Sequence, residues 1–224
     1  MIAFLTILYV ICAVLLAIYA GSEMILLLTY WRYRDKPNPI PAVKEWPSVV
    51  VQLPIYNERH VVERLLNAVA ALDYPRDRLL VQLLDDSNDE TVEIAAVRIA
   101  VLAQTGLNIQ HIRRENREGY KAGALAYGLT LTDSELVMVL DADFVPAPDF
   151  LRRTVPFLAV DPGLGMIQTR WGHLNPFSNL LTLGQTLALD GHFVVEQTAR
   201  SRAGWLMSFN GSGGVWRAQC IRDA

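Results

Sequence analysis

Hydrophobic residues follow two patterns along this chain: one unbroken run at the amino terminus and a series of short runs after residue 47. Residues 1–31 contain a single charged side chain, Glu23. Because about 20 apolar residues suffice to cross a bilayer, this run predicts a transmembrane anchor over residues 1–31. A cleaved signal peptide would need a basic segment ahead of a shorter apolar run, so a retained anchor is the favoured interpretation.

Aromatic and basic residues mark the end of this predicted anchor. Two tyrosines and a tryptophan fall within residues 30–33, and two arginines and a lysine within residues 32–36. Aromatic side chains favour the bilayer interface, and basic flanks stay on the cytoplasmic side. We therefore expect the rest of the chain in the cytoplasm, at the plasma or inner membrane. Prolines in residues 32–46 predict a stiff linker.

From residue 47 onward, short β-rich runs alternate with runs of helical periodicity. Strands are expected at residues 48–53, 79–84, 108–112, 136–140 and 165–169, and helices at 59–72, 90–104, 121–131, 149–160 and 180–200. This alternation predicts one α/β domain over residues 47–224, with a mostly parallel sheet covered on both faces. In such sheets a ligand binds beyond the carboxyl ends of the strands.

The composition agrees with a single core-forming domain plus a membrane segment. The chain has 224 residues, 52% of them hydrophobic, and a formal net charge of -3. A mildly acidic chain gives no reason to expect nucleic acid as a partner. Cys12 lies within the apolar run, so a disulfide with Cys220 is not expected. The four histidines lack the spacing of zinc ligands.

Polar residues follow four of the expected strands, at residues 54–58, 85–89, 113–121 and 141–143. Any one of these clusters is explained equally well by helix capping or turn formation, since Asp, Asn and Ser favour those positions. All four, however, fall at the same edge of a parallel sheet. Together they predict a ligand-binding edge.

Asp141-Ala142-Asp143 is the most informative of these clusters, although a lone D-x-D is a weak signal. Side chains two residues apart in an extended chain point the same way, so both carboxylates are expected to meet one cation. Oxygen ligands from few carboxylates suit Mg²⁺ or Mn²⁺ bridging to substrate phosphates. Lys121, at the start of a helix, could place a second positive charge against those phosphates.

Six segments in series resemble the motifs of family 2 processive glycosyltransferases, most closely cellulose-synthase-like and mannan-synthase-like enzymes. They are VVVQLPIYNE, LLDDSNDET, REGYKAGAL, LDADFVPAPDF, IQTRWGHLN and FNGSGGVWR. The resemblance runs from residue 48 to the chain end. It implies a Rossmann-like GT-A fold and inverting transfer of a hexose from a nucleoside diphosphate sugar, UDP-glucose or GDP-mannose, to a growing β-glycan.

The resemblance also implies roles for individual residues. Tyr56, Glu58, Asp85 and Asp86 match positions that hold the nucleoside. Lys121 matches a position that contacts the diphosphate.

Two further groups of residues complete the implied site. Asp141 and Asp143 match the catalytic pair that manages the ribose and the metal. Gly211, Ser212 and Gly213 match a loop beside the donor sugar or the acceptor end, for which a plain glycine turn is the alternative interpretation.

Two motifs of the resembled enzymes are missing. The T-E-D motif that carries the general base, and a later Q-x-x-R-W motif, do not occur before residue 224. Because inverting transfer needs a base, we expect a fragment that binds the donor without useful turnover.

Other interpretations stay open from the residues alone. The acceptor could be a lipid such as ceramide. The chain could instead be an inactive, membrane-tethered module that binds nucleotide sugars. A haloacid-dehalogenase-type phosphatase would use Asp141 as nucleophile and Asp143 as acid/base. That family needs a later lysine, and none follows Lys121.

Overall fold

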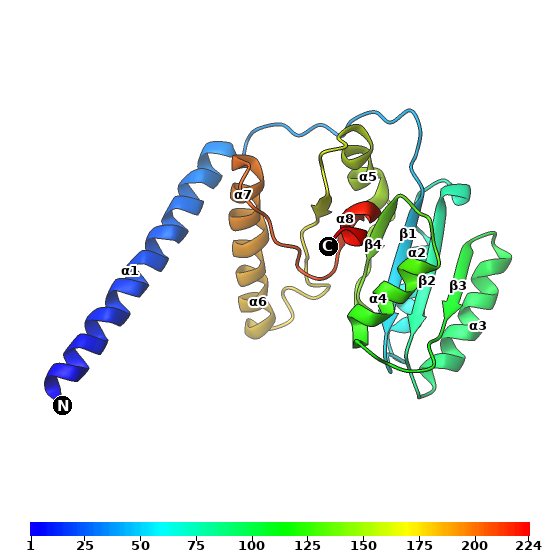
Figure 1. The fold of residues 1–224 in the computed structure, drawn as a ribbon, viewed down its shortest axis with the longest axis horizontal. Coiled ribbons are helices and arrows are strands. Elements are labelled where there is room, and N and C mark those ends of the chain that lie inside the picture. Colours follow the sequence, from blue (N-terminus) through cyan, green and yellow to red (C-terminus); the bar gives the residue numbers. More distant parts are fainter. The chain divides into compact units, whose positions relative to one another are not determined.

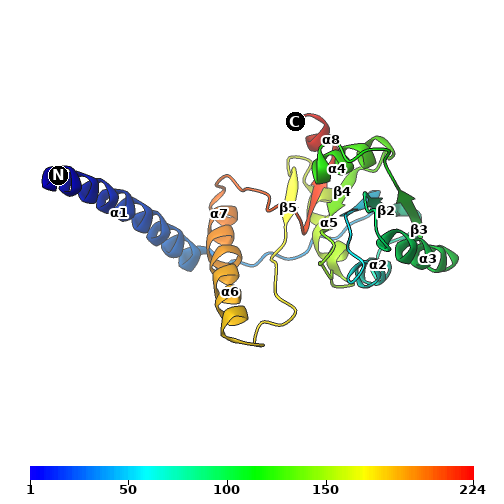
Figure 2. The same cartoon turned by 90° about the horizontal axis from the view of Figure 1, so that it is seen from below.

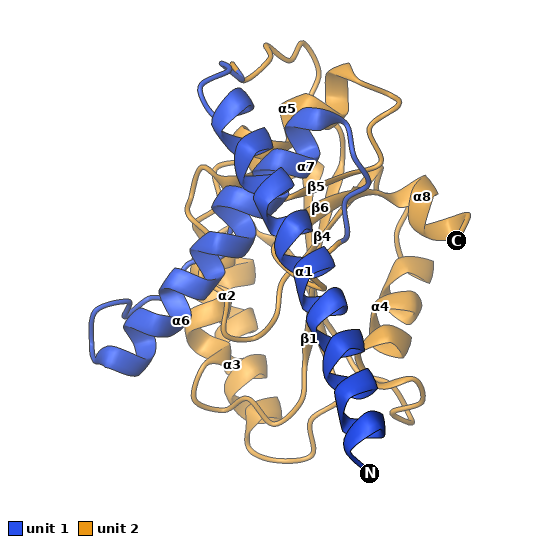
Figure 3. Ribbon diagram, turned by 90° about the vertical axis from the view of Figure 1, so that its left-hand side faces the viewer, with its two compact units in different colours: residues 1–38, 170–208 blue, residues 39–169, 209–224 orange.

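The computed structural model describes all residues from 1 to 224. The chain forms two compact units, shown in different colours in Figure 3. Unit 1 comprises residues 1–38 and 170–208, and unit 2 comprises residues 39–169 and 209–224. The hydrophobic pattern places residues 170–208 in the same domain as the sheet, whereas the structure groups them with the N-terminal helix.

Unit 2 is built on one six-stranded sheet with the order β3-β2-β1-β4-β6-β5. Figure 1 labels β3, β2, β1 and β4 side by side. Its strands are β1 (Val49–Ile55), β2 (Leu79–Asp85), β3 (Asn108–Ile112), β4 (Leu136–Val139), β5 (Met166–Gln168) and β6 (Gly214–Arg217). The first four are parallel, and β6 runs antiparallel to both β4 and β5. The expected α/β class with a mostly parallel sheet is confirmed. Strand β6 was not expected, because four residues beginning with glycine show no alternation.

Helices cover both faces of this sheet. They are α2 (Val62–Ala70), α3 (Thr91–Gln104), α4 (Tyr120–Thr130), α5 (Phe150–Val160) and α8 (Ala218–Arg222), and a short 3-10 helix, η1 (Arg76–Arg78), precedes β2. Figure 2 shows α4 and α8 on one side of the strands and α2, α3 and α5 on the other. Each helix buries an apolar stripe against the sheet, which is the physical reason for this layering.

Strand β1 lies at the centre of the sheet and contributes side chains to both cores. Val49, Val51 and Leu53 pack with the core that contains α2, α3 and α5. Val50 points the other way and packs against Ala218 of α8. Because successive strand residues face opposite sides, a strand covered twice must be apolar at every position. The nearly unbroken run of apolar residues in β1 therefore fixes its central place.

Unit 1 contains helix α1 (Ile2–Tyr33) and a second long helix made of α6 (Leu180–Asp190), the π-helical segment η2 (Gly191–Gln197) and α7 (Thr198–Ala203). Both η2 and α7 pack against α1. Asn179 and Thr182 start α6 with a capping box, in which each side chain accepts the other residue's backbone N–H. The helix expected over residues 180–200 is confirmed, but its π-helical turn left no mark in the hydrophobic pattern.

Helix α1 is long and apolar enough to cross a membrane. It has 32 residues, which at about 1.5 Å per residue exceeds the roughly 30 Å of a hydrocarbon core. Leu26 is the one buried residue on it. An apolar helix that exposes nearly all its side chains needs an apolar surrounding, and this is the physical basis for expecting an anchor.

Candidate functional site

The topology of unit 2 brings the sequence-derived candidates to one edge of the sheet. The strand order reverses at β1, which has β2 on one side and β4 on the other. Ligands of doubly wound sheets bind at this switch point, beyond the carboxyl ends of the strands. Because β6 is antiparallel to β4, the loop before β6 reaches the same edge. The segments after β1, β2, β3 and β4 and the loop at residues 210–213 therefore share one edge.

Lys121 and Asp141 form an ion pair at this edge. The Lys121 ammonium lies 2.5 Å from Asp141 Oδ1 and donates a second bond, of 2.9 Å, to the Gly211 carbonyl. Both side chains remain partly open to solvent, with exposed fractions of 42% for Lys121 and 37% for Asp141. An ion pair that water still reaches is worth little by itself, so a ligand can displace it at low cost.

The glycine-containing loop lies directly against Asp141. The backbone N–H of Asp141 donates to Ser212 Oγ over 2.8 Å, and the N–H of Gly213 donates to the Val139 carbonyl over 2.9 Å. Gly211 and Gly213 have backbone φ values of 83° and 66°, which residues other than glycine rarely adopt. The glycine turn is therefore part of the loop that bonds Asp141, because the positive φ values of Gly211 and Gly213 form it.

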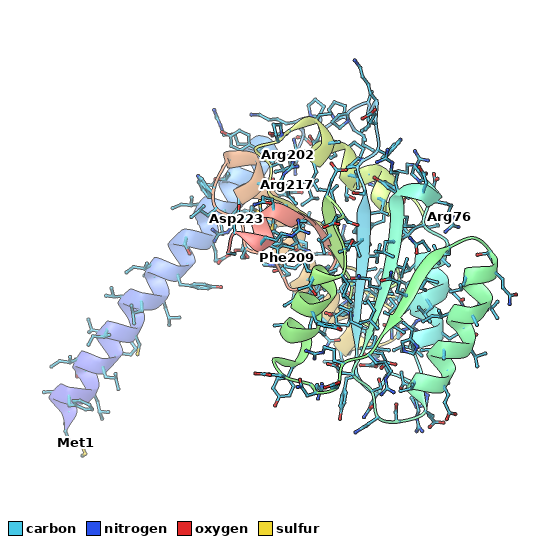
Figure 4. All side chains as sticks on the ribbon, turned by 45° about the vertical axis from the view of Figure 1, so that its right-hand side comes forward. Met1, Arg76, Arg202, Phe209, Arg217 and Asp223 are labelled. Carbon is cyan, nitrogen blue, oxygen red and sulfur yellow. The ribbon has the colours of Figure 1, made fainter.

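Gln168, which was not a candidate, holds this loop in place. Its amide nitrogen donates to the carbonyls of Ser212 and Gly213 over 3.1 Å each, and its oxygen accepts from the Asn210 N–H over 2.9 Å. Phe209, labelled in Figure 4, packs edge-on against Trp216 just before the loop. In the sequence, Gln168 stands out only as the first residue of Q-T-R-W. That motif does not indicate that its side-chain amide bonds the loop at residues 210–213.

The Asp141-Ala142-Asp143 segment forms a turn, so the expectation of an extended backbone at these residues is wrong. Strand β4 ends at Val139, and the Phe144 N–H donates back to the Asp141 carbonyl over 3.1 Å. The Asp143 side chain is exposed. No group of three or more His, Cys, Asp or Glu side chains in the chain is arranged to hold a metal ion. Asp141 and Asp143 have carboxylates open to solvent, and such oxygens could meet a cation if a ligand's phosphates supplied the others.

Asp85 does not face the solvent. Its side chain is fully buried, and its two oxygens accept from His111 Nε2 over 2.8 Å and from the Ser87 N–H over 2.9 Å. Burial alone would raise the pKa of the Asp85 carboxyl. The hydrogen bonds from His111 and Ser87 outweigh burial, and the pKa lies below its usual value. Asp85 thus fastens the end of β2 to β3 and to its own loop.

Asp86 is also satisfied from within the protein. Arg114 binds it through two parallel hydrogen bonds, Nε to Oδ1 at 3.0 Å and Nη2 to Oδ2 at 2.5 Å. The exposed fractions are 11% for the arginine side chain and 7% for the aspartate. The hydrogen bonds to Asp86 raise the pKa of the Arg114 guanidinium above its usual value. Arginine and aspartate side chains are almost never covered to this extent unless they are paired.

The segment after β1 is held to the segment after β2. Asn57, in a left-handed conformation with φ of 57°, exchanges two 3.0 Å hydrogen bonds with Asn88. The guanidinium of Arg117 lies 3.4 Å from the centre of the Tyr56 ring, a cation–π contact. Glu58 accepts the first helical N–H groups of α2 through its backbone carbonyl. Tyr56 is therefore near the edge, while Glu58 shapes the start of a helix.

This fold and this edge define a class of protein. Residues 48–182 match the model of glycosyl transferase family 2, and the chain belongs to that family. The GT-A fold expected from the motifs is thereby confirmed. Family membership leaves the phosphatase interpretation without support.

Named relatives refine this assignment. The chain is 42% identical over 219 residues to glucomannan 4-beta-mannosyltransferase 2 of Arabidopsis thaliana, covering 92% of this chain and 41% of that protein. It is 43% identical over 185 residues to glucomannan 4-beta-mannosyltransferase 1 of Cyamopsis tetragonoloba, covering 81% and 35%. These likenesses confirm the resemblance to mannan-synthase-like members of the family. The chain spans about two fifths of the length of the curated relatives it matches.

A solved structure has the same fold. The mannosyltransferase PcManGT from Pyrobaculum calidifontis, in complex with GDP-Man and Mn²⁺, superposes with a TM-score of 0.67 at 29% identity. The match covers 94% of this chain and 57% of that one. The S. aureus protein TarS, residues 1–349 with UDP-GlcNAc, superposes with a TM-score of 0.51 at 18% identity and shows the fold alone.

Proposed function

We propose that this chain binds a nucleoside diphosphate sugar and a divalent cation at the carboxyl edge of its sheet. It would serve as the donor-binding part of a membrane-bound, inverting glycosyltransferase that adds hexoses to a growing β-glycan. One observation carries this proposal: Lys121, Asp141 and the Gly211 carbonyl meet at the switch point of a family 2 fold. A lysine, a carboxylate and a tight glycine loop suit the binding of a pyrophosphate and the sugar attached to it.

The residues present fit a hard divalent cation. Asp141 is partly exposed and Asp143 is exposed, so both carboxylates can meet an ion arriving from solvent. Mg²⁺ and Mn²⁺ need few protein oxygens when phosphates and water complete their coordination. Such an ion, when bound, neutralises negative charge that develops on a departing diphosphate.

Lys121 is proposed to contact the diphosphate. Its ammonium lies 2.5 Å from Asp141 Oδ1, and a phosphate oxygen is an equally good partner for it. Asp141 and Asp143 would hold the cation, and Lys121 would contact a phosphate oxygen. The loop at residues 211–213 is proposed to line the donor sugar, since Ser212 ties it to the backbone of Asp141.

GDP-mannose is the first candidate donor, because the two plant relatives are named mannosyltransferases and PcManGT is in complex with GDP-Man. UDP-glucose is the second, on the resemblance to cellulose-synthase-like enzymes. The acceptor is proposed to be a β-glycan, with a lipid acceptor as the other outcome of an acceptor screen. Helix α1 is proposed to anchor the protein in the plasma or inner membrane, with unit 2 in the cytoplasm.

The test is calorimetric titration of the detergent-solubilised chain with GDP, UDP, GDP-mannose and UDP-glucose, each with and without Mn²⁺. We expect the ligands with one base, guanine or uracil, to bind more tightly than those with the other. Binding should depend on the metal, and no inorganic phosphate should be released. Metal-independent binding, or no binding at millimolar nucleotide, would contradict the proposal. Binding to the chain without transfer by the whole protein would favour the inactive nucleotide-sugar-binding module.

A further inference from the structure

Arg114 joins the segment after β2 to the start of α4. Its guanidinium makes a two-pronged contact with Asp86, as described above. The same group donates from Nη1 to the Glu118 carbonyl over 2.9 Å and from Nη2 to the Tyr120 carbonyl over 3.1 Å. One partly covered side chain thus binds the acidic residue after β2 and two backbone carbonyls of the turn that precedes Lys121.

The backbone of that turn is in an unfavourable conformation, so contacts with neighbouring groups are needed to hold it. Gly119 and Tyr120 both adopt positive φ values, 68° and 50°, and this is unfavourable for tyrosine. A Cβ atom on Gly123 would lie 2.0 Å from the Glu118 carbonyl oxygen and 2.8 Å from Arg114 Nη1. The first turn of α4 is therefore packed directly beneath the Arg114 guanidinium, with no room for a side chain between them.

The position of Lys121 follows from this packing. Lys121 is the residue after Tyr120, whose carbonyl Arg114 holds, and its ammonium reaches Asp141 from there. We infer that Arg114 is a positioning residue that couples the Asp86 strand end to Lys121, so that nucleoside and diphosphate are held by one rigid unit. This inference rests on the proposed function, because it assigns Lys121 to the diphosphate.

A double-mutant cycle tests the coupling. GDP and UDP are titrated with Mn²⁺ into the full chain in detergent, for the wild type, Arg114→Lys, Lys121→Ala and the double variant. Arg114→Lys keeps the positive charge but lacks the planar set of N–H donors of a guanidinium. The carbonyls of the turn therefore lose their hydrogen bonds. Each single variant should weaken binding about tenfold, a fold-change typical of a lost hydrogen bond to a charged group. The double variant should bind within about threefold of Lys121→Ala, because coupled sites are not additive.

Several outcomes decide the matter. A double variant weakened by the product of both single effects, about a hundredfold, overturns the inference. Arg98→Lys is the matched control, because Arg98 bonds Asn67 between α2 and α3 and should leave affinity unchanged. If the wild type binds neither nucleotide, both the proposed function and the inference are contradicted. If it binds and the two affinity losses are additive, only the inference is contradicted.

A second variant covers the case in which Arg114→Lys does not fold. Asp86→Asn keeps a hydrogen-bond acceptor for the guanidinium but removes its charge, and it should show the same non-additivity with Lys121→Ala. Backbone amide exchange gives a readout without nucleotide. We expect the amides of residues 119–123 to exchange faster in Asp86→Asn than in the wild type, and unchanged exchange would overturn the positioning role.

Discussion

Two acidic segments on either side of β1 look alike in the sequence and differ in the structure. Asp85 and Asp86 follow β2, and both are satisfied inside the protein, by His111 and Arg114. Asp141 and Asp143 follow β4, where Asp141 is 37% exposed in its pair with Lys121 and Asp143 is exposed. The first segment holds loops together, and the second leaves its carboxylates open to solvent, where we propose that the ligand binds.

The energetics of the two segments explain this division of roles. Removing one partner of a buried ion pair leaves an uncompensated charge and is strongly destabilising, whereas an exposed pair contributes little. A ligand that took Asp86 from Arg114 would have to overcome that cost. A ligand that takes Lys121 from Asp141 gives up almost nothing. The nucleoside is therefore expected to meet a framework built by Asp85 and Asp86 rather than displace their partners.

The largest effect is expected from Asp86→Ala. Arg114, whose side chain is 11% exposed, would keep its charge without its carboxylate. The cost in the free energy of unfolding should approach the roughly 3–5 kcal/mol that is typical of fully buried ion pairs. Urea unfolding followed by tryptophan fluorescence measures this loss. Asp77→Ala is the control, because Asp77 belongs to a surface pair with Arg78 and is 82% exposed. If Asp86→Ala lowered the free energy of unfolding no more than the control does, the proposed difference between the two segments would be contradicted.

Asp85→Asn should have an intermediate effect that depends on pH. The pKa of Asp85 is lowered in the folded protein, so the ionised form is the one that folding stabilises. Its contribution is fully present above the ordinary aspartate pKa of about 3.9 and is lost as the pH falls through the lowered value. We expect Asp85→Asn to unfold about 2 kcal/mol more easily at neutral pH, a typical cost for a buried charged hydrogen bond. The difference should shrink below about pH 4, and a constant difference at all pH values would contradict this account.

The smallest stability effect is expected from Asp141→Asn. Its pair with Lys121 is partly solvated, and such pairs contribute less than about 1 kcal/mol. The free energy of unfolding should therefore stay within that range of the wild-type value, under the same urea protocol. A loss as large as that of Asp86→Ala would mean that Asp141 belongs to the framework instead of the ligand-binding edge.

Much of the fold was predictable because β1 is apolar at almost every position and β3 spans the residues that its pattern indicated. The site edge was predictable for the same reason, since parallel strands must end on one side. Periodicity could not reveal β6, which is short, or the π-helical turn at residues 191–197. Both depend on contacts with partners distant in the sequence.

Individual site residues were predictable in type but not in burial. The sequence pattern could not separate Asp85 from Asp141, because burial depends on whether His111 or solvent lies opposite the carboxylate. The pattern also gave no sign of Arg114 and Gln168. Each binds backbone carbonyls, which carry no residue signature, and the Asp86 partner of Arg114 lies 28 residues away in the sequence. The turn at Asp141 is closed by the Phe144 N–H, which donates to the Asp141 carbonyl, and the hydrophobic pattern does not report such a backbone bond.

The most direct test concerns the two exposed carboxylates after β4. GDP and UDP are titrated with Mn²⁺ into the wild type and the double variant Asp141→Asn plus Asp143→Asn, with Asp77→Asn as a surface control. The double variant should lose at least about tenfold in affinity and its dependence on metal, with the melting temperature nearly unchanged. Undiminished, metal-dependent affinity in a folded double variant would contradict the assignment of these residues to the cation and the diphosphate.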